Sequence, residues 1–196
     1  MDSPEDARPQ LNLTGKTLIA TPALQGSFFE QAVIYICAHS EEEGTIGLIL
    51  AKAMPEMSFH KIAAELKLQI NDHANAPHIY CGGPVDPSRG FILHSPDIIY
   101  PDSHKINDRY ALSTHVTVLK DIAQGKGPKH IFFALGYSGW DAGQLESELK
   151  DNSWLTSDLF DPFALSQADD QQAVWEHALH QIGISPTQLS QFSGSA

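Results

Sequence analysis

The sequence predicts a single α+β domain built around one mixed β-sheet, and three observations lead to this prediction. A chain of 196 residues with 42% hydrophobic and 18% charged residues has the size and composition of one globular domain. Short runs rich in β-branched and aromatic residues alternate with amphipathic stretches of helical periodicity. These runs begin as a hairpin group and then interleave with helices without a regular βα alternation, which favours α+β over a doubly wound parallel sheet.

The two ends of the chain differ in composition from the rest. Residues 1–14 are polar and contain prolines, so we expect a flexible arm before a single domain at 15–190 and a flexible tail at 191–196. The first six residues are acidic and lack an apolar core, which argues against a secretory or organelle-targeting peptide. We therefore expect a cytoplasmic protein.

Apolar runs bounded by turn residues predict the strands. We expect strands at residues 16–20, 32–39, 45–50, 78–81, 90–94, 98–100 and 131–135. The second and third of these enclose a charged loop that closes on Gly44, and they should pair as a hairpin. The last is continuously apolar, which predicts a strand covered on both faces at the centre of the sheet.

Helices are predicted where apolar residues recur at helical spacing after a capping residue. We expect helices that begin at Ser58, Ser113, Asp141, about Asp169, and Ser185. The first helix carries one apolar stripe, which should face the sheet and consists of Phe59, Ile62, Ala63 and Leu66. We expect irregular surface segments at 101–109, 136–140 and 152–162.

The balance of charge argues against two classes of partner. The formal net charge is −12, so the average surface repels phosphate backbones and anionic lipids. The closest basic cluster, Lys126, Lys129 and His130, fits a solvated loop. The longest apolar run, at 32–38, is far shorter than the roughly 20 residues that a membrane-spanning helix needs. Direct nucleic-acid binding and membrane insertion are disfavoured, which leaves an unidentified small molecule or protein as partner.

Histidines and cysteines give no metal or cofactor motif. The chain has 10 histidines but no His-Glu-x-x-His or Cys-x-x-Cys pattern, and His177 and His180 lack an acidic third ligand at useful spacing. Cys37 lies in an apolar run and Cys81 opens a glycine turn, and both should remain thiols. We expect no metal and no cofactor.

The stretch 81–94 is the first candidate site. Gly82 and Gly83 allow close backbone approach, so a stiff turn should join two predicted strands. Such a turn would present Arg89 and His94, which supply a bidentate cation and a group that titrates near neutrality. The structural alternative is an arginine buried between loops.

Two further residues extend this candidate site. His39 ends the first strand of the predicted hairpin, and Glu146 lies in the helix after the glycine-rich segment. Together with Arg89 they would suit recognition of an anionic small molecule or acid–base chemistry.

The glycine-rich segment 136–140 is the second candidate. It has neither the spacing nor the lysine of a phosphate-binding loop, and Trp140 stands where a hydrolase elbow around Ser138 would need glycine. A tight structural turn is therefore the favoured interpretation. Tyr137 and Trp140 form either a stacking wall for a ligand or part of the core, and the core is favoured. Gln144 opens the helix that follows.

Several motifs at ordered spacing resemble the bacterial AlgH/YqgE family. The stretches that carry the resemblance are 18–24, 33–39, 82–85, 89–94, 134–140 and 143–146. The similarity runs from about Gly15 to the C-terminus. One departure stands at 51–53, where Ala-Lys-Ala replaces the usual Asn, Arg or Lys, and Pro, so any site that depends on that Asn is lost.

The resemblance implies a mixed α/β domain whose bifurcated sheet curls into a pseudo-barrel with flanking helices. It implies little about activity, because the family is essentially uncharacterised and its label as a transcriptional regulator comes from a link with alginate control. It supplies no catalytic residues.

Three functional hypotheses remain. The first is a non-enzymatic ligand-sensing or protein-interaction domain with an indirect role in transcriptional regulation. Its predicted ligand-binding residues are His39, Gly82, Gly83, Arg89, His94, Tyr137, Trp140, Gln144 and Glu146. The second is a small-molecule enzyme that uses Arg89 with His94 or Glu146. The third is a regulator that binds DNA directly, which the net charge disfavours.

Overall fold

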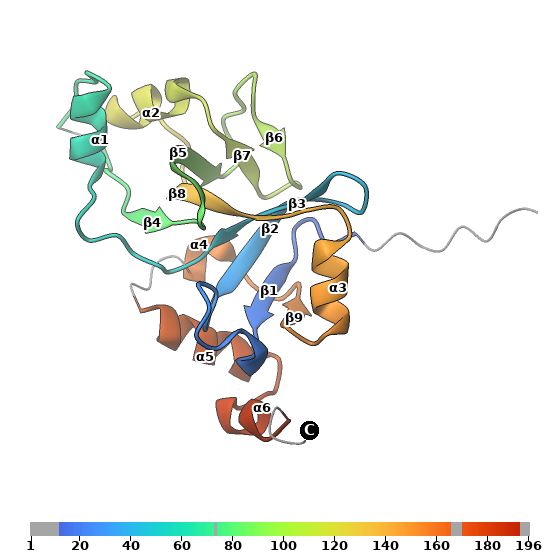
Figure 1. Ribbon diagram of the computed structural model, residues 1–196. Helices are drawn as coiled ribbons and strands as arrows, with labels where there is room; N and C mark the ends of the chain where they lie inside the picture. The colour runs from blue at the N-terminus through green and yellow to red at the C-terminus, as the bar shows by residue number, and fades with distance from the viewer. Residues whose placement is uncertain (1–11, 73, 166–169, 193–196) are drawn as a thin grey trace, which may run out of the picture.

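The computed structural model describes residues 12–72, 74–165 and 170–192, and it shows an α+β domain built on one curled, half-barrel sheet (Figure 1). The strands of the described residues are β1 Thr17–Ala20, β2 Val33–Ser40, β3 Gly44–Ile49, β4 Ile79–Cys81, β5 Val85–His94, β6 His104–Lys105, β7 Ala111–Ser113, β8 Ile131–Trp140 and β9 Trp154–Ser157. Their order is β6-β7-β5-β8-β3-β2-β1-β9, and β4 pairs with β8 in parallel. The predicted fold class and mixed sheet are confirmed.

Strand β8 joins the two parts of this sheet. Its first half pairs with β4 and β5, with Phe133 opposite both Ile79 and Ile92, whereas its last residues pair with β3, with Trp140 opposite Thr45. In Figure 1, β8 accordingly runs from the group of β4, β5 and β7 toward β2 and β3. The predicted central position of the 131–135 run is confirmed, and so is the hairpin of β2 and β3.

The helices of the described residues cover different parts of the sheet (Figure 1). They are α1 Phe59–Glu65, α2 Val116–Ala123, α3 Gln144–Lys150, α4 Pro162–Leu165, α5 Gln171–Gln181 and α6 Pro186–Phe192, with a 3-10 turn at Pro22–Leu24. Helices α1 and α2 pack near β5 and β8, and the rings of Phe59 and Phe133 lie 6.5 Å apart. Helix α5 packs against β1 and β2, where Trp175 Nε1 donates to the carbonyl of Ala20 at 2.7 Å.

The predicted capping residues Ser58 and Ser185 begin helices, and the helix expected from about Asp169 is capped by Asp170. The Ser58 hydroxyl accepts from Lys61 N at 3.3 Å, and the Asp170 carboxylate accepts from Ala173 N at 3.2 Å. Ser185 and Gln188 exchange side-chain bonds with one another's backbone N–H groups, as a capping box predicts. The predicted second helix start is wrong: Ser113 ends β7, and α2 begins after His115.

The largest error concerns the segment 136–140, which is part of β8 and not a turn. Its low strand propensity is overridden by pairing with β3, where Ile46 lies opposite Gly139. Gly136 has a φ of 70°, and a Cβ there would lie 2.6 Å from the carbonyl oxygen of Gly83. The glycine therefore bends the strand without ending it.

Four smaller predictions are also wrong. Residues 98–100 form no strand, while the segments predicted as irregular contain β6 and β9. Leu66 is 43% exposed and does not complete the stripe of α1. Leu13, assigned to the arm, is buried in the cluster that includes Trp140. The other arm residues up to 11 and the tail residues 193–196 lie outside the described residues.

None of the described helices is long and apolar enough to cross a membrane.

Candidate functional site

A cleft of about 1000 Å³ opens where β2 and β8 end and β3 begins. Of the predicted ligand-binding residues, His39, Tyr137 and Trp140 line it. Their strands are adjacent because the tight loop between β2 and β3 returns the chain beside the end of β8. A Cβ on Gly44 would lie 2.3 Å from the carbonyl oxygen of Trp140, so only glycine permits this close approach of the loop to β8.

His39, which lines the cleft, contacts Glu146, which does not line it. His39 is 1% exposed in its side chain, and its Nδ1 lies 2.8 Å from Thr45 Oγ1. Its Nε2 lies 3.3 Å from Glu146 Oε1. Glu146 comes from the first turn of α3, so the helix that follows β8 carries the carboxylate back over the hairpin. The arrangement is a histidine held between a hydroxyl and a carboxylate, largely out of water.

Glu148 holds the side chains of three residues near the cleft by hydrogen bonds, and the sequence analysis did not identify it. Its Oε2 accepts from the indole N–H groups of both Trp140 and Trp154, at 2.8 and 2.7 Å, and its Oε1 accepts from Gln144 Nε2 at 2.9 Å. Gln144 in turn accepts from Asp141 N at 3.0 Å, which fixes the turn between β8 and α3. The available signal was the pair of tryptophans on either side of a short helix, since a buried indole N–H needs an acceptor.

At Gly82 and Gly83, the turn between β4 and β5 crosses the backbone of β8. The Gly82 carbonyl accepts from the Ser138 hydroxyl at 3.0 Å. A Cβ on Gly83 would lie 2.2 Å from the carbonyl carbon and oxygen of Tyr137. These glycines let the turn between β4 and β5 lie directly against the backbone of β8.

Arg89 and His94 lie elsewhere in the structure. Arg89 is exposed, where its Nη2 donates to Thr114 Oγ1 at 3.3 Å and its guanidinium lies 5.4 Å from the Phe91 ring centroid. It is therefore not the buried arginine of the structural alternative. His94 is 0% exposed, and its Nδ1 and Nε2 lie 2.9 Å from Ser95 O and Ser113 Oγ. Burial lowers the pKa of His94 below its ordinary value.

The proposed acid–base groups are not gathered around one cleft. His94 pairs with the first residue of β8, whereas Glu146 follows its last residue. Nine steps of strand separate these ends, about 30 Å. The cleft around His39 is lined by neither Arg89 nor His94.

Carboxylates dominate the charge around the cleft. Glu41, Glu42 and Glu43 of the β2–β3 loop line it, and so does Asp141, which follows β8. The lysine of the lining, Lys105, has its Nζ 2.7 Å from the Asp108 carboxylate. The local field therefore favours cations.

The described part of the chain holds no group of three or more His, Cys, Asp or Glu side chains placed to bind a metal ion. Both cysteines are thiols, as predicted. Cys37 is buried, which raises the pKa of its thiol, and the half-buried Cys81 directs its Sγ to Gly83 O at 3.8 Å.

The fold and the cleft define a class: a one-domain α+β protein whose curled sheet carries a polar cleft at the end of its central strand. A family model described as DUF179, AlgH-like, matches residues 17–187. The chain is 44% identical to a UPF0301 protein of Paracoccus denitrificans over 94% of this chain and 97% of that protein. It is 42% identical to a UPF0301 protein of Bradyrhizobium, over 94% and 88%. The chain therefore belongs to the AlgH-like family, as the resemblance predicted.

Solved structures agree with this assignment. The solution structure of the AlgH protein from Pseudomonas aeruginosa is 33% identical with a TM-score of 0.75, and the match covers 100% of this chain and 97% of that one. A crystal structure of a protein from Corynebacterium diphtheriae is 18% identical with a TM-score of 0.65, covering 89% and 88%, which shows a shared fold.

Proposed function

We propose that this chain is a non-enzymatic binding domain that takes a small cationic ligand in the cleft around His39. The observation that carries the proposal is the excess of carboxylates over lysine in an aromatic-walled cleft. Any effect on transcription would then be indirect and pass through the ligand or a protein partner.

The charge of the cleft lining supports a cation as the ligand. Glu42, Glu43 and Asp141 are exposed residues that line the cleft, while the ammonium of Lys105 is already paired with Asp108. A recess lined by one sign of charge concentrates ions of the other sign. The anionic ligand expected from Arg89 is not supported here, because Arg89 does not line the cleft.

The aromatic wall supports an organic cation over a bare metal ion. Tyr137 is half-buried, and its ring packs 5.2 Å from that of Phe91, so its position in the wall is fixed. Ammonium groups bind over aromatic faces with about 0.5–2 kcal/mol per contact. A quaternary or polyamine nitrogen at this wall would meet the carboxylates of the lining as well.

Binding is favoured over catalysis by the state of the titratable groups. The His39 side chain is only 1% exposed and is held between Thr45 and Glu146, and Glu146 does not line the cleft, so this pair is poorly placed to exchange protons with a ligand there. His94, the other proposed base, lies at the opposite end of β8 with both ring nitrogens bonded.

Thermal unfolding of the purified chain with choline and with spermidine tests the proposal. Ligand at about a hundred times its Kd should raise the melting temperature by about 5 °C, because binding stabilises the folded state alone. Acetate should give no shift. Native mass spectrometry of gently purified protein provides a second readout, in which a retained cationic molecule is expected.

Two variants test whether cation binding depends on the carboxylates that line the cleft. The double variant Glu42→Gln/Glu43→Gln should weaken cation binding about fivefold or more, and Glu65→Gln, an exposed acid on α1, should leave it unchanged. No shift with either cation, or equal shifts in the two variants, would contradict the proposal.

The direct regulator hypothesis makes the opposite prediction. Retardation of random DNA at low salt that declines steeply as salt rises would indicate phosphate contacts. Such a result would replace the cation proposal, since a lining of carboxylates repels phosphate.

A further inference from the structure

A second site lies at the other end of β8. A hollow of about 490 Å³ opens between the segment before β4, the loop after α2, the first residues of β8 and α4. Its apolar surfaces include Ile122, Tyr80 and Phe163. The hollow is independent of the cleft around His39, since the two have no lining residue in common.

The charge of this hollow is opposite to that of the whole chain. Lys129, His130 and His78 line it, and its lining contains no aspartate or glutamate, although the protein carries a net charge of −12. The carboxylate associated with Lys129 is Asp97, which accepts from the Lys129 backbone N–H at 3.2 Å and from the Ser95 hydroxyl. Two residues of the cluster predicted as a solvated loop, Lys129 and His130, are exposed and line this recess, whereas Lys126 does not line it.

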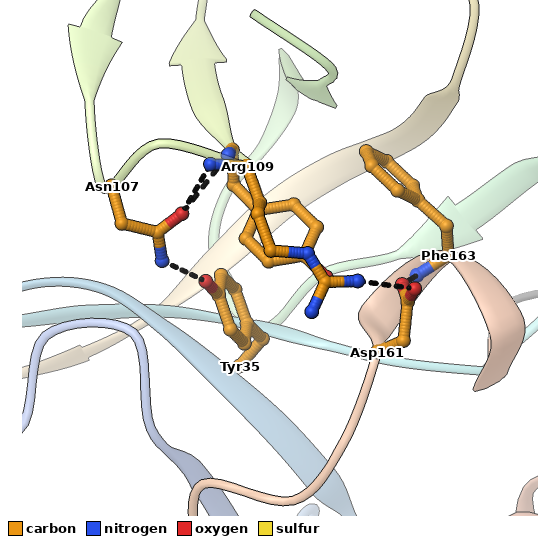
Figure 2. Close-up of polar contacts among 6 residues, drawn as sticks. Tyr35, Asn107, Arg109, Asp161 and Phe163 are labelled. Carbon is orange, nitrogen blue, oxygen red and sulfur yellow. Dashed lines mark hydrogen bonds and ion pairs between the residues drawn. The ribbon is translucent and has the colours of Figure 1, made fainter.

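A neighbouring hollow of about 500 Å³ has two of the same residues in its wall. His130 and Phe163 line both, and their rings are stacked with centroids 5.5 Å apart. Arg109 and Asp161 border the second hollow and are joined by a 3.0 Å ion pair. Figure 2 shows Arg109 reaching Asp161 beside the ring of Phe163.

The second hollow also contains an unsatisfied hydroxyl. Tyr110 is 4% exposed, and its Oη is buried without a hydrogen-bond partner among the described residues. Asp161 lies close enough that, together with burial, it raises the pKa of Tyr110 to about 12, but it forms no hydrogen bond of good geometry with the phenol. An unpaired buried hydroxyl destabilises the folded state, and a ligand with a matching polar group would supply the missing hydrogen bond.

We propose that these two hollows form one binding site for a small, flat molecule that carries an anionic group, carboxylate or phosphate, and a second polar group. The anion lies near Lys129 and His130, the ring lies against Phe163, and the polar group reaches the Tyr110 hydroxyl. Lysine and histidine supply charge-assisted hydrogen bonds to such an anion. The stacked ring pair gives a planar surface for the ring.

Isothermal titration of the full chain with five defined probes tests the site. The probes are 4-hydroxybenzoate, benzoate, 4-hydroxybenzamide, phenyl phosphate and inorganic phosphate. We expect 4-hydroxybenzoate or phenyl phosphate to bind with a Kd of about 1 mM or tighter. The neutral amide should bind at least about tenfold more weakly, because it lacks the charge. The preferred probe then shows whether carboxylate or phosphate is the natural group.

Matched variants assign the contacts. Lys129→Gln should weaken binding of the preferred anion about tenfold, whereas Lys126→Gln, an exposed lysine outside the lining, should change it less than about twofold. Tyr110→Phe should weaken binding of 4-hydroxybenzoate but not of benzoate. The same change should leave the free energy of unfolding unchanged or slightly raised, because it removes a hydroxyl without a partner.

The proposal is overturned by no saturable binding of any probe up to about 10 mM. It is equally overturned by anion binding that Lys129→Gln and Tyr110→Phe both leave at the level of the unmodified chain.

Discussion

The two ends of β8 differ in charge and in how their histidines are held. At the Trp140 end the cleft is bordered by Glu42, Glu43 and Asp141, whereas at the Ile131 end the hollow is bordered by lysine and histidine without a lining carboxylate. The two regions lie at opposite ends of the ten-residue strand β8, whose length along the chain of about 30 Å exceeds the screening length of about 8 Å in physiological salt. A net charge of −12 therefore describes neither region, and each selects its ligand locally.

The buried histidine side chains at the two ends, His39 and His94, also differ in the groups that they contact. At the cleft, the His39 ring lies between the Thr45 hydroxyl and the Glu146 carboxylate. At the other end, His94 is bonded to a hydroxyl and a carbonyl, and burial lowers its pKa. The histidine at one end of β8 therefore faces a carboxylate, while the histidine at the other end is hydrogen-bonded to uncharged groups.

The largest loss of stability is expected between the two ends of β8, at Gly83, where the turn between β4 and β5 crosses the strand. Gly83→Ala should lower the free energy of unfolding by more than about 4 kcal/mol, because its Cβ would lie 2.2 Å from the backbone of Tyr137. Gly143→Ala is the matched control: nothing lies within 4 Å of its Cβ, and only its φ of 75° costs about 1 kcal/mol. Urea unfolding measures both, and equal losses would show that the close crossing does not matter.

Loss of the Glu148 carboxylate should disturb the cleft end alone. Glu148→Ala leaves the indole N–H groups of Trp140 and Trp154 without their acceptor, for a loss of about 3 kcal/mol. Glu65→Ala on the exposed side of α1 should stay within about 0.5 kcal/mol. Denaturant unfolding followed by tryptophan fluorescence gives the values. A loss below 1 kcal/mol would mean that solvent replaces the carboxylate.

Acidification should weaken the Ile131 end. The folded state holds His94 neutral, with a pKa below the ordinary 6.5, while the unfolded chain takes up the proton near that value. The stabilising contribution is thus fully present above about pH 6.5 and is lost as pH falls through the lower pKa of the folded state, at up to about 1.4 kcal/mol per pH unit.

Urea unfolding at pH 7.5, 6.5 and 5.5 measures this dependence. The variant His94→Gln should flatten it, and His60→Gln, which removes an exposed histidine of α1, should retain it. A slope that His94→Gln does not change would assign the effect to another group.

The smallest effect is expected at the exposed pair beside the second hollow. Arg109 and Asp161 are 69% and 39% exposed in their side chains, so Arg109→Ala should cost less than about 1 kcal/mol, with little change at high salt. Asp161→Ala should cost more, because Asp161 also accepts from Phe163 N at 2.9 Å at the start of α4. Urea unfolding of the two variants distinguishes them, and the reverse order would contradict the capping role.

Much of the local structure was predictable because its causes are local. The hairpin of β2 and β3 follows from two apolar runs around an acidic loop, and the caps at Ser58 and Ser185 follow from short-range hydrogen bonds. The strand β9 was missed because Trp154–Ser157 has no extended apolar pattern, and it becomes a strand only by pairing with β1.

The candidate site was predictable only in part. His39, Tyr137 and Trp140 line one cleft. Arg89 and His94, which were predicted to belong to the same site, do not line it and contact other groups. The bulge in β5 between Val85 and Gly90 separates the turn from the strand that follows, and no local pattern gives the direction of its side chains.

The sequence by itself determined the fold class, the central strand, most helix starts and the family, because apolar periodicity, capping and motif spacing are properties of neighbouring residues. The tertiary structure alone decided that 136–140 continues β8, that Glu148 holds two tryptophans, and that Lys129 and His130 line a recess. Each of these depends on groups brought together across the sheet. The physical reason is that cross-strand pairing and burial override local propensity, and neither can be read from spacing along the chain.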